Sequence, residues 1–477
     1  MIKKDFVILA IILIFAIIAR TYKINTPLAD LHSWRQADTA AVARNFARDG
    51  INLLRPTYDD LSSIETGHEN PEGLRMVEFP IYNAIVAIFY RYFPVTSIEI
   101  YGRAISAIMS LVTIFGIYYI ALKDKNRWAA IFAGLIFAIY PFFVFFSRVV
   151  LPEPTAVAMV TLSIVFLYKA LESKKANLSL LLVSAVLFAL SILVKPTTIF
   201  YGLTMGFLFL YKFRFNVFKI PKVYLFFLIS FVPLILWRLY ITQFPEGIPA
   251  SAWLITNVNT FEGPKNIFFK PAFFRWIFME RIGIAIFGIY GTIFFVFGSI
   301  CKTKKHISLS MLLSAVLYLF TFQGGNVQHE YYQTIILPAL AIVSGVGIAT
   351  LMEISDKYVN KLALYPVLIV TLILGSLFSF YRVKDYYIYP NDLPQIAELI
   401  RTFTLPTDRI VTDRSGDTTL LYLADRKGAP AVYKEVNELK NLGYSYLVTS
   451  NEGMKKNLRD KGYQILVENE LYMIVKL

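Results

Sequence analysis

The sequence predicts a mainly α, polytopic membrane helix bundle of about eleven transmembrane helices, followed by a small α/β domain. Of its 477 residues, 56% are hydrophobic and only 17% are charged. A water-soluble chain of this length would not spread so many apolar residues so evenly. The basic residues fall in short clusters between apolar runs, which is typical of the cytoplasmic loops of membrane proteins.

The first span is expected at residues 6–20, directly after the basic start Met1-Ile2-Lys3-Lys4. No small-residue cleavage site precedes Asp30, so we interpret this segment as a retained signal anchor with a cytoplasmic N-terminus. Further apolar runs are each about long enough to cross the hydrocarbon core of a bilayer. These runs occupy residues 104–122, 128–146, 155–171, 178–194, 197–211, 223–241, 282–300, 307–322, 334–352 and 362–381.

Residues 78–93 are apolar but short for a span. If they do not span, all the basic clusters lie on the cytoplasmic side, namely 123–127, 174–175, 212–222, 302–305 and 357–361. If they do span, every cluster lies outside. The positive-inside rule therefore predicts an interfacial or re-entrant helix at 78–93. The same alternation places the following segments outside: 31–77, 147–153, 242–281, 323–333 and the C-terminus.

The chain after residue 384 has the Gly, Asp and Lys content of a soluble domain. Strand-like runs at 409–412 and 445–449 alternate with helix-like segments at 394–403 and 452–461, which predicts a small α/β domain. We therefore expect a transmembrane domain at 1–384, containing a first outer loop at 23–100 with interfacial helices, and an extracytoplasmic domain at 385–477. The predicted location is the cytoplasmic (inner) membrane, crossed many times.

The composition excludes several other classes of protein. The net charge of +14 comes from loop clusters rather than from one basic face, so a nucleic-acid partner is not expected. The single cysteine, Cys301, excludes an intramolecular disulfide and a zinc site built from cysteines. A divalent metal is possible but is not implied by the sequence, and no cofactor is indicated.

The stretch from Leu31 to Phe46 carries the candidate catalytic residue, Asp38. A carboxylate at the mouth of a membrane bundle is costly unless a function or a partner requires it. The alternative is a surface ion pair between Asp38 and Arg35, one helical turn earlier.

Three more polar groups are predicted on the outer side. Arg148 lies at the end of one span and Glu153 at the start of the next, Lys195 precedes Pro196, and a third group contains His329, Tyr331 and Tyr332. Each has a structural alternative. Glu153 could be a helix-start acid, Lys195 could extend to the interface, and the tyrosines could belong to an aromatic belt.

Carboxylates and cations at the outer interface suit a substrate that has one end in lipid and a charged, sugar-like head. An acid there can take a proton from an incoming hydroxyl or amine. Arginine, lysine or histidine can hold a lipid phosphate and offset the charge that develops on the leaving group.

Together these motifs resemble the GT-C superfamily of membrane glycosyltransferases, in the branch of protein O-mannosyltransferases and aminoarabinose transferases. The resemblance covers the whole membrane region. It includes Glu78-Phe79-Pro80 with its amphipathic helix, Leu151-Pro152-Glu153, and the His-x-Tyr-Tyr motif at 329–332. The form Trp34-Arg35-Gln36-Ala37-Asp38-Thr39 is similar to a subgroup of family 39-like glycosyltransferases.

The resemblance implies an inverting transfer of a hexose or pentose from a polyprenyl-phosphate donor. The acceptor would be a glycan, lipid or protein outside the membrane. Asp38 would be the base and Glu153 would orient the acceptor or support the base. The other residues expected to bind substrate are Trp34, Arg35, Gln36, Glu78, Arg148, Lys195, His329, Tyr331 and Tyr332.

Two departures from the family pattern affect these assignments. Relatives often carry an Asp-Glu pair early in the first loop, whereas here the aspartates are split between Asp30 and Asp38. Aminoarabinose transferases place a lysine between the acid and the proline, where this chain has Phe79. The phosphate contact must then come from another cation, with Lys195, Arg35 and Arg148 as candidates.

The competing function is a multi-spanning transporter or flippase for lipid-linked sugars. It would also need many spans and interfacial charges. The sequence has no obvious internal repeat and no charged residue at the middle of a span, where coupling sites usually lie.

Overall fold

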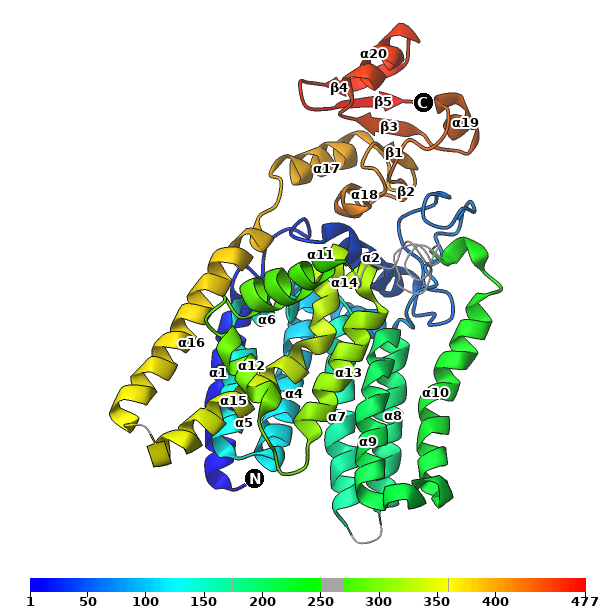
Figure 1. Ribbon diagram of the computed structural model, residues 1–477. Coiled ribbons are helices and arrows are strands. Elements are labelled where there is room, and N and C mark those ends of the chain that lie inside the picture. Colours follow the sequence, from blue (N-terminus) through cyan, green and yellow to red (C-terminus); the bar gives the residue numbers. More distant parts are fainter. Residues whose placement is uncertain (174–175, 250–269, 359) are drawn as a thin grey trace. The chain divides into compact units, whose positions relative to one another are not determined.

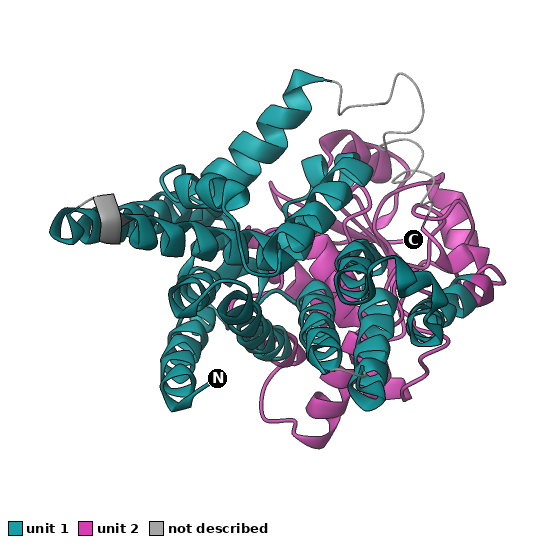
Figure 2. Cartoon of the chain, turned by 60° about the horizontal axis from the view of Figure 1, so that its bottom comes forward, with its two compact units in different colours: residues 1–24, 103–238, 251–386 teal, residues 25–102, 239–250, 387–477 magenta. Residues whose placement is uncertain are grey.

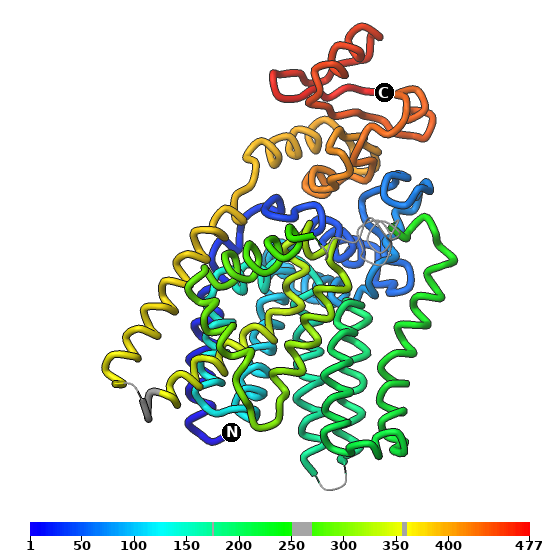
Figure 3. The backbone as a smooth tube through the Cα atoms, viewed as in Figure 1, coloured from blue at the N-terminus to red at the C-terminus, as the bar shows by residue number. Residues whose placement is uncertain are grey.

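The computed structural model describes residues 1–173, 176–249, 270–358 and 360–477 (Figure 1). It has two compact units, coloured separately in Figure 2. Unit 1 comprises Met1–Ile24, Arg103–Arg238 and Ser251–Tyr386, and unit 2 comprises Asn25–Gly102, Leu239–Ala250 and Tyr387–Leu477. The path of the chain through these segments can be followed in Figure 3.

Unit 1 is helical. Its α-helices are α1 Lys3–Thr21, α4 Ile98–Asp124, α5 Arg127–Ile139, α6 Pro141–Phe146, α7 Glu153–Glu172, α8 Leu178–Val194, α9 Gly202–Phe213, α10 Pro221–Ile241, α11 Pro271–Phe274, α12 Thr292–Ile300, α13 Ile307–Thr321, α14 Gln323–Gln328, α15 Leu337–Tyr358 and α16 Lys361–Val383. Shorter helical turns are η1 Pro196–Tyr201, η2 Arg214–Lys219 and η8 Glu330–Ile336, and η7 Arg275–Ile286 is a π-helix.

Five helices in the described residues are long and apolar enough to cross a membrane. They are Ile98–Asp124, Glu153–Glu172, Pro221–Ile241, Glu330–Ile354 and Lys361–Phe403. Shorter apolar helices lie at Arg127–Ile139, Leu178–Val194 and Ile307–Thr321. These helices support a multi-spanning membrane protein, whereas the count of eleven spans and their orientation stay predictions.

Two predicted spans are interrupted in the structure. The run at 128–146 divides into α5 and α6 at Pro141, because a proline has no backbone N–H to continue the helix. The run at 282–300 divides between η7 and α12, where Gly288 has a φ of 57°. Half of the predicted outer segment 242–281, namely residues 250–269, lies outside the described residues, as does the whole cluster at 174–175.

Helix α15 is at the centre of unit 1 because its glycines allow two other helices to approach closely. A Cβ atom on Gly345 would lie 2.4 Å from the carbonyl oxygen of Ala129 in α5. A Cβ on Gly347 would lie 2.1 Å from the carbonyl of Phe294 in α12. Small residues at such crossings are the usual means of packing helices in a membrane.

Unit 2 contains a five-stranded sheet in the order β2-β1-β3-β5-β4. Its strands are β1 Ile410–Thr412, β2 Gly428–Ala429, β3 Tyr446–Thr449, β4 Gln464–Glu468 and β5 Met473–Lys476. The strand β1 is parallel to β2 and β3, and β5 is antiparallel to β3 and β4. The helices of this part are α17 Asp392–Phe403, α18 Thr419–Ala424, α19 Val436–Asn441 and α20 Glu452–Asp460.

Side chains alternate between the two faces of this sheet, as the pleat of a strand requires. Ile410 and Val448 join one apolar cluster with residues of α17 and α18. Val411 and Leu447 join a second cluster with residues of α19 and α20. The strand-like and helix-like runs predicted at 394–461 are therefore α17, β1, β3 and α20.

The remaining helices of unit 2 are α2 Ser33–Asp49 and α3 Ile81–Tyr92. With 12 residues, α3 is too short for a span, and Ile88, Phe89, Tyr92 and Phe93 are exposed on it or just after it. Its position at the membrane interface stays a prediction.

The first loop joins the sheet of unit 2 by backbone pairing. Gly428 donates from its N–H to the carbonyl of Asp59 at 2.8 Å, and Leu61 donates to the carbonyl of Gly428 at 2.7 Å. This parallel bridge covers the β2 edge, which would otherwise expose unpaired backbone groups. The two units thus divide the chain differently from the predicted domains, because residues 25–102 group with 387–477.

We expect Gly345→Ala to destabilise the protein, because the added methyl would meet backbone atoms of α5 that cannot rotate away. Overpacking of this kind costs about 1–3 kcal/mol. The control is Gly206→Ala in α9, where nothing lies within 4 Å of the added Cβ. Thermal unfolding in detergent should show a lower midpoint for Gly345→Ala alone, and equal midpoints would refute the packing argument.

Candidate active site

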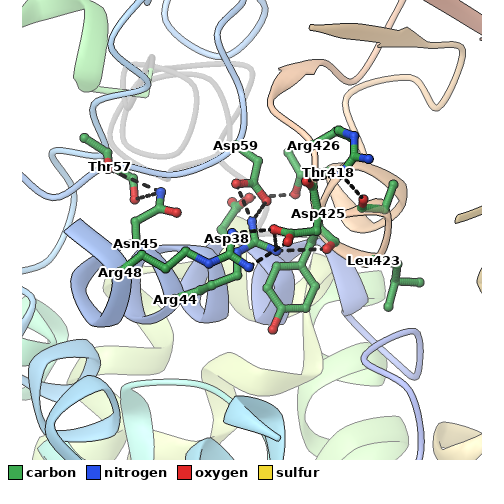
Figure 4. Close-up of polar contacts among 12 residues, drawn as sticks. Asp38, Arg44, Asn45, Arg48, Thr57, Asp59, Thr418, Leu423, Asp425 and Arg426 are labelled. Carbon is green, nitrogen blue, oxygen red and sulfur yellow. Dashed lines mark hydrogen bonds and ion pairs between the residues drawn. The ribbon is translucent and has the colours of Figure 1, made fainter. Parts of the chain in front are cut away.

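Asp38 lies in the second turn of α2, which starts after His32 in a left-handed conformation. Its side chain is buried, with 1% exposed. Thr418, 380 residues later, donates its hydroxyl to Oδ1 of Asp38 at 2.6 Å (Figure 4). The carboxylate is therefore fixed by a residue from the C-terminal part of unit 2.

Arg75 is the cationic partner of Asp38. Its Nη2 lies 2.8 Å from Oδ2 of Asp38, and its Nη1 pairs with Glu65. The guanidinium also lies over the ring of Tyr58, 4.8 Å from the centroid. One arginine is thus shared between two carboxylates and held against an aromatic face.

The alternative of a surface pair between Asp38 and Arg35 is wrong. Arg35 instead pairs with Glu78 at 2.5 Å, and Asp38 is buried against Arg75. This joins two of the residues predicted to bind substrate, Arg35 and Glu78, in one ion pair.

Burial raises the pKa of Asp38 to about 7. Arg75 opposes this shift by favouring the ionised form, whereas the negative charge of Glu65 adds to it. A carboxylate of this kind is a good proton acceptor at neutral pH, because its pKa is close to the operating pH.

The other predicted residues of the first loop hold α2 in place. Gln36 donates from Nε2 to Oδ1 of Asp30 at 2.7 Å and to the carbonyl of Leu31 at 3.0 Å. Trp34 is half-buried, and its carbonyl accepts a hydrogen bond from Thr418 at 3.3 Å. Asn83 of α3 donates to the carbonyl of Thr39, which ties α3 to α2.

In unit 1 the structure brings together three of the predicted polar groups. Glu153 is the first residue of α7 and is 1% exposed. Its Oε1 lies 2.7 Å from Nζ of Lys195, at the end of α8. Nζ also lies 5.7 Å and 5.3 Å from the ring centroids of Tyr331 and Tyr332.

His329 completes this cluster by stacking on both tyrosines. Its ring centroid is 5.5 Å from that of Tyr331 and 6.2 Å from that of Tyr332. Glu330, between them in sequence, turns to Arg281 of η7 and pairs with it. The His-x-Tyr-Tyr motif therefore presents an aromatic surface to the ammonium group that pairs with Glu153.

Arg148 is positioned differently from the other predicted cations. It is completely buried, donates to the carbonyl of Lys23 at 3.2 Å and stacks near Phe145. The hydrogen bond to Lys23 fixes the chain segment that directly follows α1. Lys195 and Arg35, the other two predicted phosphate contacts, each pair with a carboxylate instead.

Sequence reasoning missed Arg75, Glu65 and Thr418. Arg75 is three residues before Glu78, so its closeness to an acidic motif was a weak signal. Thr418 had no signal, because nothing local connects it with a helix in the first loop.

Within the described part of the chain, no three His, Cys, Asp or Glu side chains converge to hold a metal ion.

Comparisons with known proteins agree with this architecture. Residues 78–237, about a third of the chain, match the family model of dolichyl-phosphate-mannose-protein mannosyltransferases. This segment contains Glu78, Arg148, Glu153 and Lys195 but not Asp38. No curated protein sequence matches the chain.

Solved structures match over nearly the whole chain. Apo ArnT from Cupriavidus metallidurans has a TM-score of 0.65 at 12% identity, covering 99% of this chain and 97% of ArnT. Its complex with undecaprenyl phosphate gives 0.63 at 13%, with the same coverage. The archaeal oligosaccharyltransferase AglB from Archaeoglobus fulgidus, bound to an inhibitory peptide and a dolichol-phosphate, gives 0.58 at 11%, covering 94% and 69%.

The fold is therefore that of the GT-C membrane glycosyltransferases, and the resemblance stated from the sequence is confirmed. More particularly, the chain resembles ArnT from end to end and the mannosyltransferase model over 78–237.

We expect Lys195→Met to destabilise unit 1, because it leaves Glu153 buried without its partner. Breaking a buried pair from one side costs about 3–5 kcal/mol. The double variant Lys195→Met/Glu153→Gln removes both charges and should unfold at a higher temperature than Lys195→Met alone. If the double variant lowers the unfolding temperature by the sum of the losses in Lys195→Met and Glu153→Gln, the two residues do not act as a pair.

Proposed function

We propose that the protein transfers a sugar from a polyprenyl-phosphate donor to an acceptor, with Asp38 as the general base. The observation that carries this proposal is the buried Asp38, held by Thr418 and Arg75, with a pKa near neutrality. The mannosyltransferase match and the lipid phosphates bound to ArnT and AglB support the donor class.

In the proposed reaction, Asp38 takes the proton from an acceptor hydroxyl or amine. The freed electron pair forms a bond to the anomeric carbon of the sugar, and the bond from that carbon to the phosphate oxygen breaks. The polyprenyl phosphate leaves with the electron pair of the broken bond. Attack opposite the leaving group inverts the anomeric centre, and a cation is needed to offset the negative charge of the phosphate.

Lys195 is our first candidate for that cation, with Arg35 as the second. The ammonium of Lys195 is buried against Tyr331 and Tyr332 and pairs with the carboxylate of Glu153. A lysine in such surroundings can exchange a protein partner for a phosphate oxygen, because both are anionic acceptors. His329 and the two tyrosines would line the donor side, and Glu153 would orient the acceptor or support the base.

We further propose that the reaction takes place outside the cytoplasmic (inner) membrane. The support is the uniform sidedness of the basic loop clusters, which puts residues 31–77 and the C-terminus on the outer side. The sugar would be a hexose or a pentose, and the acceptor a glycan, lipid or protein.

We predict that Asp38→Asn abolishes sugar transfer while folding is retained. Asparagine keeps the size and can still accept a hydrogen bond from Thr418, but it cannot take a proton at neutral pH. The rate should fall by about a hundred- to ten-thousand-fold. The measurement is release of free polyprenyl phosphate from a polyprenyl-phosphate sugar by purified protein, which a transporter would not produce.

The matched control is Asp49→Asn, which removes an exposed carboxylate from the same helix. Glu153→Gln should reduce turnover less than Asp38→Asn, and Asp30→Asn least, because Asp30 holds Gln36 rather than the base. Normal turnover in Asp38→Asn together with loss in Asp30→Asn would make Asp30 the base.

The pH dependence follows from the raised pKa of Asp38. Only the ionised form accepts a proton, so kcat/KM should rise with pH up to about 7 and then level. Burial also raises the pKa of Asp60 to about 7, and the negative charge of Asp38 adds to that shift. Asp60→Asn is therefore the control, and it should keep the rise of kcat/KM with pH while moving its midpoint only slightly, to lower pH. A profile already level from about pH 5 would contradict a base of this pKa.

A further inference from the structure

Unit 2 contains an open cavity of about 330 Å³ that the proposed reaction does not use. Its walls come from α2, the first loop and the segments that precede β1 and β2. The charged lining residues are five cations and three carboxylates, an excess of two positive charges: Arg44, Arg48, Arg409, Arg426 and Lys427 against Asp59, Asp408 and Asp425.

The carboxylates of this cavity are already engaged. Arg44 donates to both oxygens of Asp59 at 2.6 Å, and Arg48 binds both oxygens of Asp425 at 2.7 and 2.6 Å (Figure 4). Asp408 accepts from the backbone N–H of Leu405 at 2.6 Å. The three acids therefore fix the walls of the cavity and do not neutralise the excess charge.

The cation Arg426 is also occupied. It donates from Nε to the hydroxyl of Thr404 at 2.9 Å and from Nη2 to the carbonyl of Thr404 at 2.8 Å. These bonds hold the turn between α18 and β2 against the end of α17. The carboxylate of Asp408 also acts electrostatically on Arg426. With these two charges set against each other, the excess of two positive charges belongs to Arg409 and Lys427.

Arg409 and Lys427 are held side by side by the sheet. Each directly precedes a strand, and the parallel strands β1 and β2 pair with Ile410 opposite Gly428. Ile410 donates from its N–H to the carbonyl of Lys427 at 3.1 Å, so the two cations occupy neighbouring positions on adjacent strands. Both are half-buried, and within the described ranges neither side chain makes a hydrogen bond or an ion pair.

Like charges at neighbouring positions on adjacent strands repel each other. Backbone pairing holds β1 and β2 together, and they approach so closely at Gly428 that a Cβ there would lie 1.8 Å from the carbonyl oxygen of Ile410. The protein therefore keeps two unneutralised cations close together at the wall of a cavity. A bound anion would remove this repulsion, because it would pair with both.

We propose that this cavity binds a sugar-sized ligand through a carboxylate or phosphate group held between Arg409 and Lys427. The volume is at the lower end of the range for small-molecule pockets, about 300–1,000 Å³, which fits one or two sugar rings. The planar guanidinium of Arg409 suits two-point contact with such an oxyanion, and Lys427 adds a point charge. The site is separate from Asp38 in its residues and does not depend on the reaction assigned to that residue.

The experiment is calorimetric titration of the purified full-length protein with glucuronate, glucose 1-phosphate and glucose. Glucuronate and glucose 1-phosphate test the two sources of the oxyanion, and glucose is the neutral comparison. We expect binding of at least one anionic sugar, weakened by added salt, and no binding of glucose. The double variant Arg409→Gln/Lys427→Gln should weaken that binding by about tenfold or more, as loss of charge-assisted contacts requires.

Lys440→Gln is the matched control, because Lys440 is an exposed lysine of α19 in the same unit. It should leave affinity unchanged, and Asp38→Asn should do so as well, even where sugar transfer is lost. Without ligand, the double variant should unfold at an equal or higher temperature, since a repulsion is relieved. Equal binding of glucose, unchanged affinity in the double variant, or a lower unfolding temperature would each overturn the proposal.

Discussion

The burial of the Asp38 carboxylate is the constraint on which unit 2 depends. An ionised aspartate with 1% exposure is stable only where cations and donors replace its water. Here α2 carries the acid, the first loop supplies Arg75, and the C-terminal part supplies Thr418. The first outer loop and the C-terminal part must therefore fold together, in agreement with the single compact unit that residues 25–102 and 387–477 form.

Unit 1 also buries a carboxylate beside a cation, but here the cation is a lysine. Glu153 starts an apolar helix long enough to span a membrane, and its charge is matched by Lys195 rather than by an arginine. A lysine carries a compact charge on a flexible chain, and the faces of Tyr331 and Tyr332 confine it. Each unit thus contains a buried carboxylate that pairs with a cation, Asp38 with Arg75 and Glu153 with Lys195.

The sequence predicts the features of the protein that depend on local patterns of residues. The helical class, the candidate base and the acids, cations and tyrosines of unit 1 follow from hydropathy and from short motifs. What it could not predict depends on packing between distant segments. Thr418 approaches Asp38 because β1, α18 and the first loop share a core, and the bridge from Asp60 to Gly428 has no local signature. The break at Gly288 was missed because an apolar run does not reveal a left-handed residue.

The sharing of Arg75 affects how readily Asp38 can act as a base. An arginine devoted to one aspartate would favour its ionised form so strongly that the carboxylate would accept a proton poorly. Here Glu65 takes part of the same guanidinium, and its negative charge acts against ionisation of Asp38. Burial is the largest cause of the shift, and the pKa of Asp38 is raised to about 7. A general base must be ionised before it reacts, and its pKa must be high enough for it to accept a proton. Arg75 serves the first requirement, and Glu65 together with burial serves the second.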